Sequence, residues 1–255
     1  MRVIVTRPAS EAGRWVDALR ERGFDAHSMP LIGIAPVADP AVIRAAWHSL
    51  AQNRAVMFVS GNAARHFLAQ QPPGLAWPAT TRAWAPGPGT GQALLDGGVD
   101  AALIDSPPPS APQFDSETLW QQVAPQVRPG DRALIVRGGD AAGTSSGRDW
   151  LADQLGAAGA QVDLVVAYRR QAPELSEAQL RQAGDAAAAG DAWLFSSSQA
   201  IAHLRAALPR QDWSRARAVA THPRIADAAR RAGFGVVCES RPAMDAVVAA
   251  LESFR

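Results

Sequence analysis

Small polar, glycine and arginine residues gather just after short apolar segments, and these residues could hold an anionic ligand. Hydroxyl groups, guanidinium groups and the backbone N–H groups beside glycine all donate hydrogen bonds to carboxylate or phosphate oxygens. They are found in segments 6–10, 60–63, 86–91, 137–147, 196–199 and 221–225. The expected ligand-binding residues are Thr6, Arg7, Ser60, Gly61, Asn62, Gly87, Thr90, Ser116, Arg137, Gly138, Gly139, Arg148, Ser197, Ser198, His222 and Arg224.

Tyr168 is the only tyrosine of the chain. It ends an apolar run and precedes two arginines. A lone phenol there could hydrogen-bond at a domain edge, or it could act as an acid. The serines lack the G-x-S-x-G context of a nucleophile. The five histidines lack the spacing of metal ligands, so we expect no metal site.

Two glycine-containing segments leave alternatives open. Segment 87–91 (GPGTG) could be a tight strand-to-helix turn, an anion-binding helix start capped by Thr90, or a nucleotide loop. The last option is weakened because the segment lacks a P-loop lysine and the third glycine of a dinucleotide fingerprint. Segment 137–148 could be a loop that cradles carboxylates between Arg137 and Arg148, or a flexible surface excursion. His66 and His203 are expected at helix-packing positions, and His222 in a ligand-facing loop.

The elements that position these residues occur twice along the chain, in three blocks and in the same order. RVIVTR at 2–7 matches RALIVR at 132–137, and MFVSGNAARHFL matches LFSSSQAIAHL. RAWAPGPGTGQALLDGG at 82–98 matches RAVATHPRIADAARRAG at 217–233. The first block is followed by an expected helix and a second apolar run, at 15–22 and 29–36 in one copy and at 151–158 and 162–168 in the other.

Each block reads as a short apolar strand, a loop and a helix. That alternation predicts an α/β fold of two similar lobes, each a mostly parallel sheet flanked by helices. Ligands of such sheets gather beyond the carboxyl ends of the strands, where the polar segments lie. The proline-rich segment 106–116 is expected to be a loop that leads to a helix capped by Ser116.

Bulk properties exclude several classes of protein. The chain has 255 residues, 47% of them hydrophobic, and a net charge of +1 with no basic stripe, which disfavours nucleic-acid binding. No apolar run approaches the roughly 20 residues of a membrane helix. Cys238 is the single cysteine, which excludes an internal disulfide. We therefore expect a cytoplasmic protein without membrane contact.

The ordered set of motifs resembles the uroporphyrinogen-III synthase family over essentially the whole chain. The motifs are VIVTRP, MFVSGNA, APGPGTGQAL, DSETL, LIVRGG, VAYRR, LFSSSQAI and THPRIADAARRAGF. The resemblance implies two lobes joined by a two-stranded link, one of residues 1–36 plus 171–255 and the other of residues 38–168. In that arrangement the two copies have exchanged their first units. The sequence alone would also permit two halves divided near Pro129.

The resemblance also implies an activity. The substrate would be hydroxymethylbilane, a linear tetrapyrrole with acetate and propionate groups, which is cyclised to uroporphyrinogen III with inversion of the last ring and loss of water. No cofactor is implied, and catalysis would rest on positioning between two closing lobes. The resemblance implies that Tyr168 protonates the departing hydroxyl and that Thr90 matches a family threonine. The matching loop reads HPRI instead of containing a threonine, so His222 or Arg224 is expected to bind carboxylate there.

Other interpretations of the same sequence belong to different classes. The bilobed fold could serve as a non-catalytic sensory module that binds an anion or a tetrapyrrole. A nucleotide-binding enzyme of two domains is a weaker option. As partners we expect the linear tetrapyrrole and, transiently, the preceding enzyme of the pathway, with the chain itself a monomer.

Overall fold

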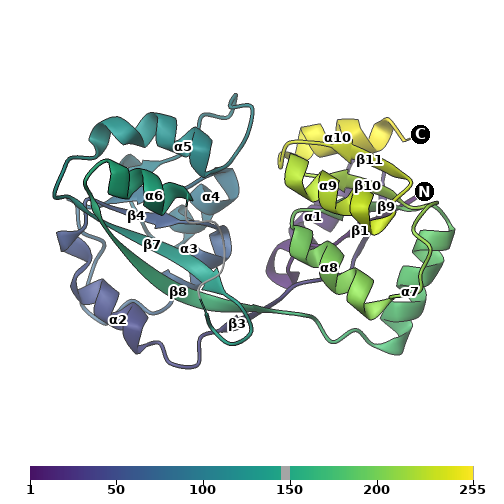
Figure 1. Ribbon diagram of the computed structural model, residues 1–255, viewed down its shortest axis with the longest axis horizontal. Helices are drawn as coiled ribbons and strands as arrows, with labels where there is room; N and C mark the ends of the chain where they lie inside the picture. Colours follow the sequence, from purple (N-terminus) through teal and green to yellow (C-terminus); the bar gives the residue numbers. More distant parts are fainter. Residues whose placement is uncertain (145–149, 255) are drawn as a thin grey trace. The chain divides into compact units, whose positions relative to one another are not determined.

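The computed structural model describes residues 1–144 and 150–254, and the chain forms two compact units (Figure 1). Unit 1 comprises Met1–Gly33 and Gln171–Arg255, and unit 2 comprises Ile34–Arg170. The chain passes between the units twice, at β3 and at the end of β8, and these two strands are neighbours in one sheet. β3 thus belongs to the sheet of unit 2, whereas the resemblance had grouped residues up to 36 with the other lobe.

Unit 1 is built on a five-stranded sheet in the order β11-β10-β9-β1-β2, with parallel neighbours. Its strands are β1 (Arg2–Val5), β2 (Asp25–Ser28), β9 (Ala192–Phe195), β10 (Arg217–Ala220) and β11 (Val236–Glu239). Its helices are α1 (Ala9–Arg20), α7 (Glu177–Ala188), α8 (Ser198–Ala207), α9 (Pro223–Ala232) and α10 (Met244–Glu252).

Helices cover both faces of this sheet because its strands bury side chains on both sides. Val3 and Val5 of β1 pack in one cluster with Trp15 of α1 and Leu251 of α10. In β9, Trp193 stacks with Phe195 at 6.1 Å between ring centroids, in a group of aromatic rings that includes Trp213 and Phe234. A strand buried on both faces needs the nearly continuous apolar sequence seen here.

Unit 2 contains a six-stranded sheet in the order β3-β8-β7-β4-β5-β6. Its strands are β3 (Gly33–Pro36), β4 (Ala55–Phe58), β5 (Arg82–Trp84), β6 (Ile104–Asp105), β7 (Arg132–Gly139) and β8 (Gln161–Gln171). Its helices are α2 (Ala41–His48), α3 (Gly61–Leu68), α4 (Pro88–Asp96), α5 (Ser116–Val123) and α6 (Trp150–Ala157), with short 3-10 turns at Leu50–Gln52, Ala101–Leu103 and Ala124–Gln126.

The period of two in β4 distributes its side chains between two cores. Val56 and Phe58 pack in the cluster that contains Phe67 of α3, whereas Ala55 and Met57 pack in the cluster formed with α5 and α6. Successive residues of a strand point to opposite faces, so an uninterrupted apolar strand serves both layers. None of the helices in the described part of the chain is long and apolar enough to cross a membrane.

The strand orders confirm the predicted fold class and explain the repeat. In unit 1 the central strand β9 has β1 and β2 on one side and β10 and β11 on the other, and in unit 2 β4 has β7 and β8 on one side and β5 and β6 on the other. The β1-α1-β2 segment of unit 1 therefore corresponds to β7-α6-β8 of unit 2. One precedes the rest of its unit in the chain and the other follows it.

Two local predictions in the first copy were wrong. The first helix begins at Ala9 instead of Trp15, with Pro8 before it as the N-cap residue. The run 29–36 is not one strand, because β2 ends at Ser28 and β3 starts at Gly33. Strand β2 has the polar sequence DAHS and lies at a sheet edge, where only Ala26 is fully buried. An edge strand needs little apolar sequence, so hydrophobicity missed it.

Asp191 ties the N-terminal strand to the rest of unit 1. Its carboxylate accepts hydrogen bonds from the backbone N–H and the Nε of Arg2, both at 2.8 Å, and Asp191 is only 3% exposed. We expect Asp191→Ala to lower the free energy of unfolding by about 1.5–3 kcal/mol, because two hydrogen bonds to a buried charge are lost.

The repeat supplies a matched control for this prediction. Arg132 corresponds to Arg2, and its partner Asp163 is exposed, so Asp163→Ala is expected to cost less than about 1 kcal/mol. Chemical denaturation followed by tryptophan fluorescence measures both variants. Equal losses in the two would show that Asp191 contributes no more than a surface ion pair.

Candidate functional site

Tyr168 lies inside β8 at the carboxyl-end edge of the unit 2 sheet, and a β-bulge sets its direction. Arg137 pairs with Val166 but Gly138 pairs with Tyr168, so Ala167 is an extra residue on β8. Val165, Ala167 and Tyr168 all pack in the cluster that includes α3. Strict alternation would place Tyr168 on the opposite face from Ala167. The bulge therefore turns the phenol toward α3.

Gly138 makes room for the phenol ring. A Cβ built at this glycine would lie 2.5 Å from Cζ and 2.8 Å from the hydroxyl oxygen of Tyr168. Any side chain at position 138 would collide with a ring that is itself only 3% exposed. The glycine is thus required by the close approach of Tyr168 across the two strands.

Two side chains of the adjoining loop and helix contact Tyr168 from the α3 side. The Oγ of Ser60 lies 3.2 Å from the Tyr168 hydroxyl, within hydrogen-bonding distance. The imidazole of His66 stacks on the phenol, with ring centroids 5.7 Å apart and planes at 26°. Burial, and secondarily the cation of Arg65, lowers the pKa of His66 from its ordinary value, which favours a neutral imidazole beside the phenol.

Helix α3 starts at the same point. Ser60 is its N-cap residue, and its Oγ accepts a hydrogen bond from the Ala63 N–H at 3.2 Å. Asn62 is buried, and its Oδ1 accepts a hydrogen bond from Arg65 at 3.0 Å. A Cβ at Gly61 would lie 3.2 Å from the Gly89 carbonyl oxygen, so the starts of α3 and α4 are close neighbours.

The start of α4 differs from the predicted capped helix. Gly87 is the N-cap residue, and no side chain among the described residues caps α4. Thr90 lies in the first turn and is only 6% exposed, because its side chain faces the core. Of the alternatives left open for this segment, the helix start capped by Thr90 was therefore wrong. Phe114 packs on Gly87, where a Cβ would lie 2.9 Å from the Phe114 Cβ.

Helix α5, which the sequence predicted to be capped by Ser116, has its N-cap residue one position earlier in the chain. Asp115 is the N-cap of α5, and its carboxylate accepts hydrogen bonds from the N–H and the hydroxyl of Thr118, both at 2.8 Å. Ser116 is the first helical residue and is half-buried. Aspartate and serine are both favourable N-cap residues, and here the carboxylate oxygen of Asp115 is the one that accepts the Thr118 N–H.

Arg137, Gly138 and Gly139 belong to strand β7 and not to the predicted loop. All three are buried, and they pair with β8 as far as Gly139, whereas the pairing of β7 with β4 ends at Val136. A Cβ at Gly139 would lie 2.9 Å from both Val166 and the backbone of Gly143. Runs of arginine and glycine have low strand propensity, which is why the sequence favoured a loop. Arg148 lies outside the described residues.

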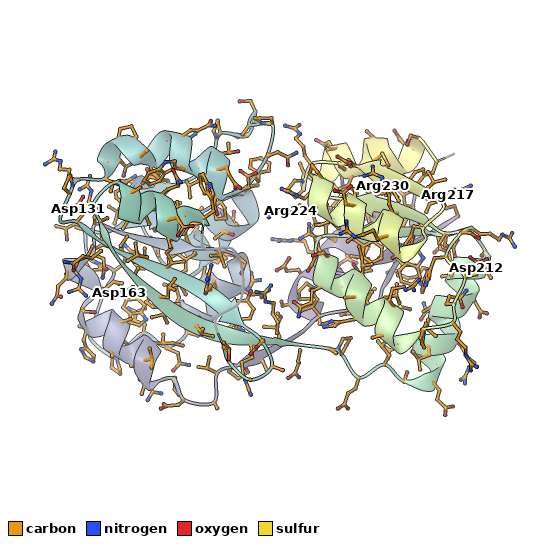
Figure 2. The ribbon with its side chains drawn as sticks, in the orientation of Figure 1. Asp131, Asp163, Asp212, Arg217, Arg224 and Arg230 are labelled. Carbon is orange, nitrogen blue, oxygen red and sulfur yellow. The ribbon has the colours of Figure 1, made fainter. Side chains whose placement is uncertain are left out.

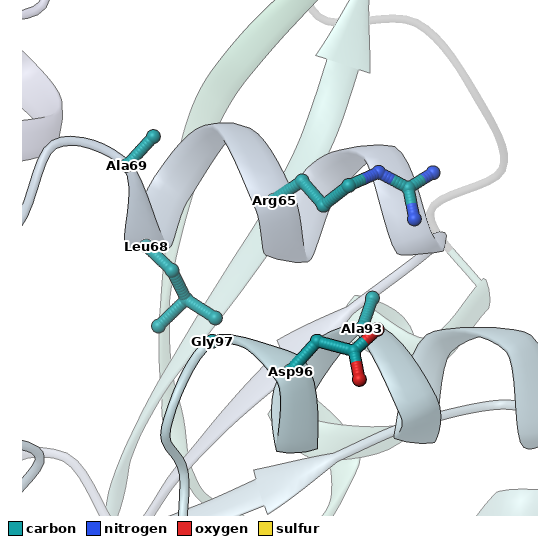
Figure 3. Close-up of a pocket in the computed structure, with 6 residues that line it drawn as sticks. All are labelled: Arg65, Leu68, Ala69, Ala93, Asp96 and Gly97. Atoms are coloured by element: carbon teal, nitrogen blue, oxygen red, sulfur yellow. The ribbon is translucent and has the colours of Figure 1, made fainter. Parts of the chain in front are cut away.

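A shallow cavity of about 300 Å³ lies between α3 and α4 (Figure 3). Arg65, Leu68 and Ala69 line it from α3 and its end, and Ala93, Asp96 and Gly97 line it from α4 and its end. Figure 3 shows the guanidinium of Arg65 extended along α3. No sequence pattern singles out Arg65 or Asp96, since charged residues on helices are ordinary. Only the packing of the two helices brings them together.

In unit 1, Thr6 and Arg7 follow β1 at the matching edge. The Thr6 hydroxyl donates to the Leu194 carbonyl at 2.8 Å, and the residue is 1% exposed. Arg7 forms an ion pair with Glu11 at 3.1 Å, and its guanidinium lies 4.2 Å from the centroid of the Trp15 ring. Burial lowers the pKa of Arg7, against the opposing effect of Glu11. Thr6 thus joins the end of β1 to β9, and Arg7 contacts two residues of α1.

The remaining expected residues of unit 1 lie at the starts of α8 and α9. Ser197 caps α8 by accepting a hydrogen bond from Gln199 N–H at 3.2 Å, and Ser198 is exposed in the first turn. His222 caps α9, where its Nδ1 accepts from the Arg224 N–H at 3.1 Å. The side chain of Arg224 is exposed at this start (Figure 2). Each group is placed at a helix start, where a carboxylate is favoured.

Apart from Arg148, the structure therefore places most of the expected residues in the last residues of strands or at helix starts of two separate sheets. Within unit 2, Ser60, Gly138 and Tyr168 are in direct contact. Across residues 1–144 and 150–254, no cluster of three or more histidine, cysteine, aspartate or glutamate side chains is arranged to hold a metal ion. The substrate-binding roles assigned from the sequence stay predictions.

Known proteins match both the sequence and this architecture. The family model for uroporphyrinogen-III synthase HemD matches residues 13–249. The uroporphyrinogen-III synthase of Salmonella typhimurium is 32% identical over 180 residues, which are 70% of this chain and 69% of that protein. That of Chlorobaculum parvum is 32% identical over 148 residues, 56% of this chain and 55% of its own.

Solved structures agree at the level of the fold. A mutant uroporphyrinogen III synthase from the extremely thermophilic bacterium Thermus thermophilus aligns with a TM-score of 0.57 at 18% identity, over 100% of this chain and 97% of that one. The uroporphyrinogen-III synthetase of Helicobacter pylori 26695 aligns with a TM-score of 0.58 at 15% identity, over 100% of both chains. Since the family model spans nearly the whole chain, the chain belongs to the uroporphyrinogen-III synthase family.

Proposed function

We propose that this chain is a uroporphyrinogen-III synthase, which cyclises hydroxymethylbilane to uroporphyrinogen III with inversion of the last ring and release of water. The observation that carries the proposal is the placement of Tyr168. A single phenol is buried on a glycine, stacked on a histidine and within hydrogen-bonding distance of a serine at a helix start. Such an arrangement fixes one proton donor in one orientation.

In the proposed reaction the phenol of Tyr168 acts as a general acid. The bond between carbon and oxygen in the hydroxymethyl group breaks, and the departing oxygen takes the phenolic proton and leaves as water. The methylene carbon left behind becomes part of a protonated azafulvene, a cation, which a substituted carbon of the last ring attacks to give a spiro intermediate. Fragmentation and reclosure then invert that ring, and the proton lost in the final step returns to the phenolate.

The acetate and propionate groups of the substrate need donors around the edge of each sheet. In unit 2 we propose the starts of α3 and α4 and the cations nearby, and in unit 1 Arg7, Arg224 and the starts of α8 and α9. The N-termini of helices favour carboxylates through their unpaired N–H groups and their dipole. Catalysis by such contacts is mainly positioning, since the unaided bilane also closes, though without inversion.

We further propose that the chain acts as a monomer in a reducing, cytoplasmic compartment, with transient contact to the enzyme that supplies the bilane. Cys238 has no second cysteine with which to form an internal disulfide. The alternative, a binding module without turnover, shares the fold but requires no oriented acid. Incubation with hydroxymethylbilane separates the two, since an enzyme gives the type III isomer and a binding module leaves only the uninverted type I isomer.

Replacement of Tyr168 tests the assignment of the acid. We expect Tyr168→Phe to lower the rate of type III formation by about 10²-fold or more, because general acid catalysis contributes on this order. The ring and its packing on Gly138 remain, so the unfolding midpoint should change little. Chromatographic separation of the two isomers measures the result, and unchanged turnover would remove Tyr168 from the mechanism.

Gly138→Ala tests the placement of Tyr168 without altering the phenol itself. The added Cβ would lie 2.5 Å from the ring, so the ring must move. We expect kcat/KM to fall by about 10²-fold, as is typical when a catalytic group shifts by about 1 Å.

Gly13→Ala in α1 is the control for this substitution. A Cβ there meets no atom of the described residues within 4 Å. That variant should keep full activity and gain about 0.5–1 kcal/mol of stability from the better helix former. Full activity of Gly138→Ala would show that the close packing of Tyr168 does not serve catalysis.

A further inference from the structure

Ser60 occupies a position where one hydroxyl serves two partners. Its Oγ accepts the Ala63 N–H at the start of α3, at 3.2 Å, and lies 3.2 Å from the hydroxyl of Tyr168. From the sequence Ser60 was expected to bind the substrate. We propose instead that Ser60 is a positioning residue that donates its own proton to the Tyr168 oxygen, and so leaves the phenolic proton free for the substrate. This inference rests on the proposed function.

The direction of the hydrogen bond follows from the position of Ser60 at the helix start. A serine hydroxyl has one proton and two lone pairs. One lone pair is turned toward α3 because it accepts the Ala63 N–H. The positive potential of the helix N-terminus attracts the oxygen and repels the hydroxyl proton, which therefore points away from the helix. The Tyr168 oxygen, 3.2 Å from the Ser60 Oγ, is within reach of that proton.

The side chains near Tyr168 favour the same direction of this hydrogen bond, with Ser60 as donor and Tyr168 as acceptor. On α3 the facing titratable side chain is His66, whose pKa is lowered by burial and by Arg65, which favours the neutral imidazole. Arg137 precedes Gly138 on β7, and Arg169 and Arg170 follow Tyr168 on β8. Strand β3 has the sequence GIAP and contributes no titratable side chain. No carboxylate lies among these neighbours in the described residues, so no anion competes with the tyrosine oxygen for the serine proton.

This arrangement has a consequence for the proposed reaction. When Tyr168 gives its proton to the departing hydroxyl, negative charge develops on its oxygen. A hydrogen bond donated by Ser60 strengthens as that charge grows, and it therefore stabilises the transition state more than the ground state. The reverse arrangement, with Tyr168 donating to Ser60, would direct the acidic proton away from the substrate.

The single tyrosine makes the hydrogen bond directly observable. Ultraviolet resonance Raman spectroscopy of the ligand-free protein records the tyrosine Fermi doublet, whose intensity ratio is high when the phenol oxygen accepts a hydrogen bond and low when it donates strongly. All of this signal comes from Tyr168. We expect the ratio to decrease from the unaltered protein to Ser60→Ala, because the accepted hydrogen bond is lost.

Ser60→Asp separates the positioning role from the capping role. Aspartate is as good an N-cap as serine, so α3 keeps its start, but an ionised carboxylate can only accept. Tyr168 must then donate to position 60, and the intensity ratio should fall below that of Ser60→Ala. Ser176→Ala is the matched control, because Ser176 caps α7 through the same third-residue N–H, from Gln179 at 3.3 Å. It should leave the doublet and the activity unchanged.

A ratio that rises in Ser60→Ala would overturn the proposal, since it would mean that Tyr168 had been the donor. An unchanged ratio would overturn it as well. In steady-state assays we expect Ser60→Ala to lower kcat by about 10²- to 10³-fold, as with loss of one donor to a developing oxyanion. KM should stay within about twofold, whereas a residue that only binds substrate would change KM instead.

The two readouts keep this inference separate from the proposed function. If the unaltered protein forms no type III isomer, the proposed function fails, while the spectrum of the ligand-free protein still decides the direction of the Ser60–Tyr168 hydrogen bond. If the spectrum shows Tyr168 as donor while type III isomer forms, only the role of Ser60 is refuted.

Discussion

The need to cover parallel strands on both faces governs the structure of both units. Strands β4 and β9 are buried throughout, and each lies at the centre of its sheet. A strand in this position requires helices on both sides, and each helix must return the chain to the same end of the sheet. The helix starts therefore follow the carboxyl ends of the strands. The backbone N–H groups and capping side chains of those helix starts are found there as a consequence of the fold. The helix starts and polar side chains at both edges are thus a by-product of how the core is covered.

Against this background the surroundings of Tyr168 are a departure from regularity. A regular strand β8 would direct the phenol to the face opposite Ala167, but the bulge turns it toward α3. Gly138 then has to be a glycine, and Ser60 and His66 meet the ring from the helix side. An irregular strand is retained where it aims a side chain, and here it aims the one residue with an acid's chemistry.

The internal repeat shows which features of this site are structural and which are specific to one unit. His203 of α8 corresponds to His66, and its Nδ1 lies 2.7 Å from the Leu31 carbonyl, in the segment that follows β2. His66 contacts Tyr168 of β8, so both histidines pack against the equivalent strand or the residues just after it, whereas the sequence had predicted only a shared helix-packing position. Of the two units, only unit 2 has a tyrosine in contact with this histidine. Thr90 and Ile225 likewise occupy equivalent buried positions, so the threonine hydroxyl is added to a site whose first requirement is packing.

The amino-acid sequence by itself determined the fold class, the repeat and the edges at which the polar residues gather. These follow from patterns along the chain, namely apolar runs, glycine after helices and hydroxyl residues at helix starts. Only the tertiary structure decided that Arg137–Gly139 form a buried strand, that Asp115 rather than Ser116 caps α5, and that Thr90 faces the core. It also decided the contacts of Tyr168, since Ser60 lies 108 residues away in the chain. Register, bulges and the direction of a side chain depend on contacts between distant segments, and no local pattern in the sequence encodes them.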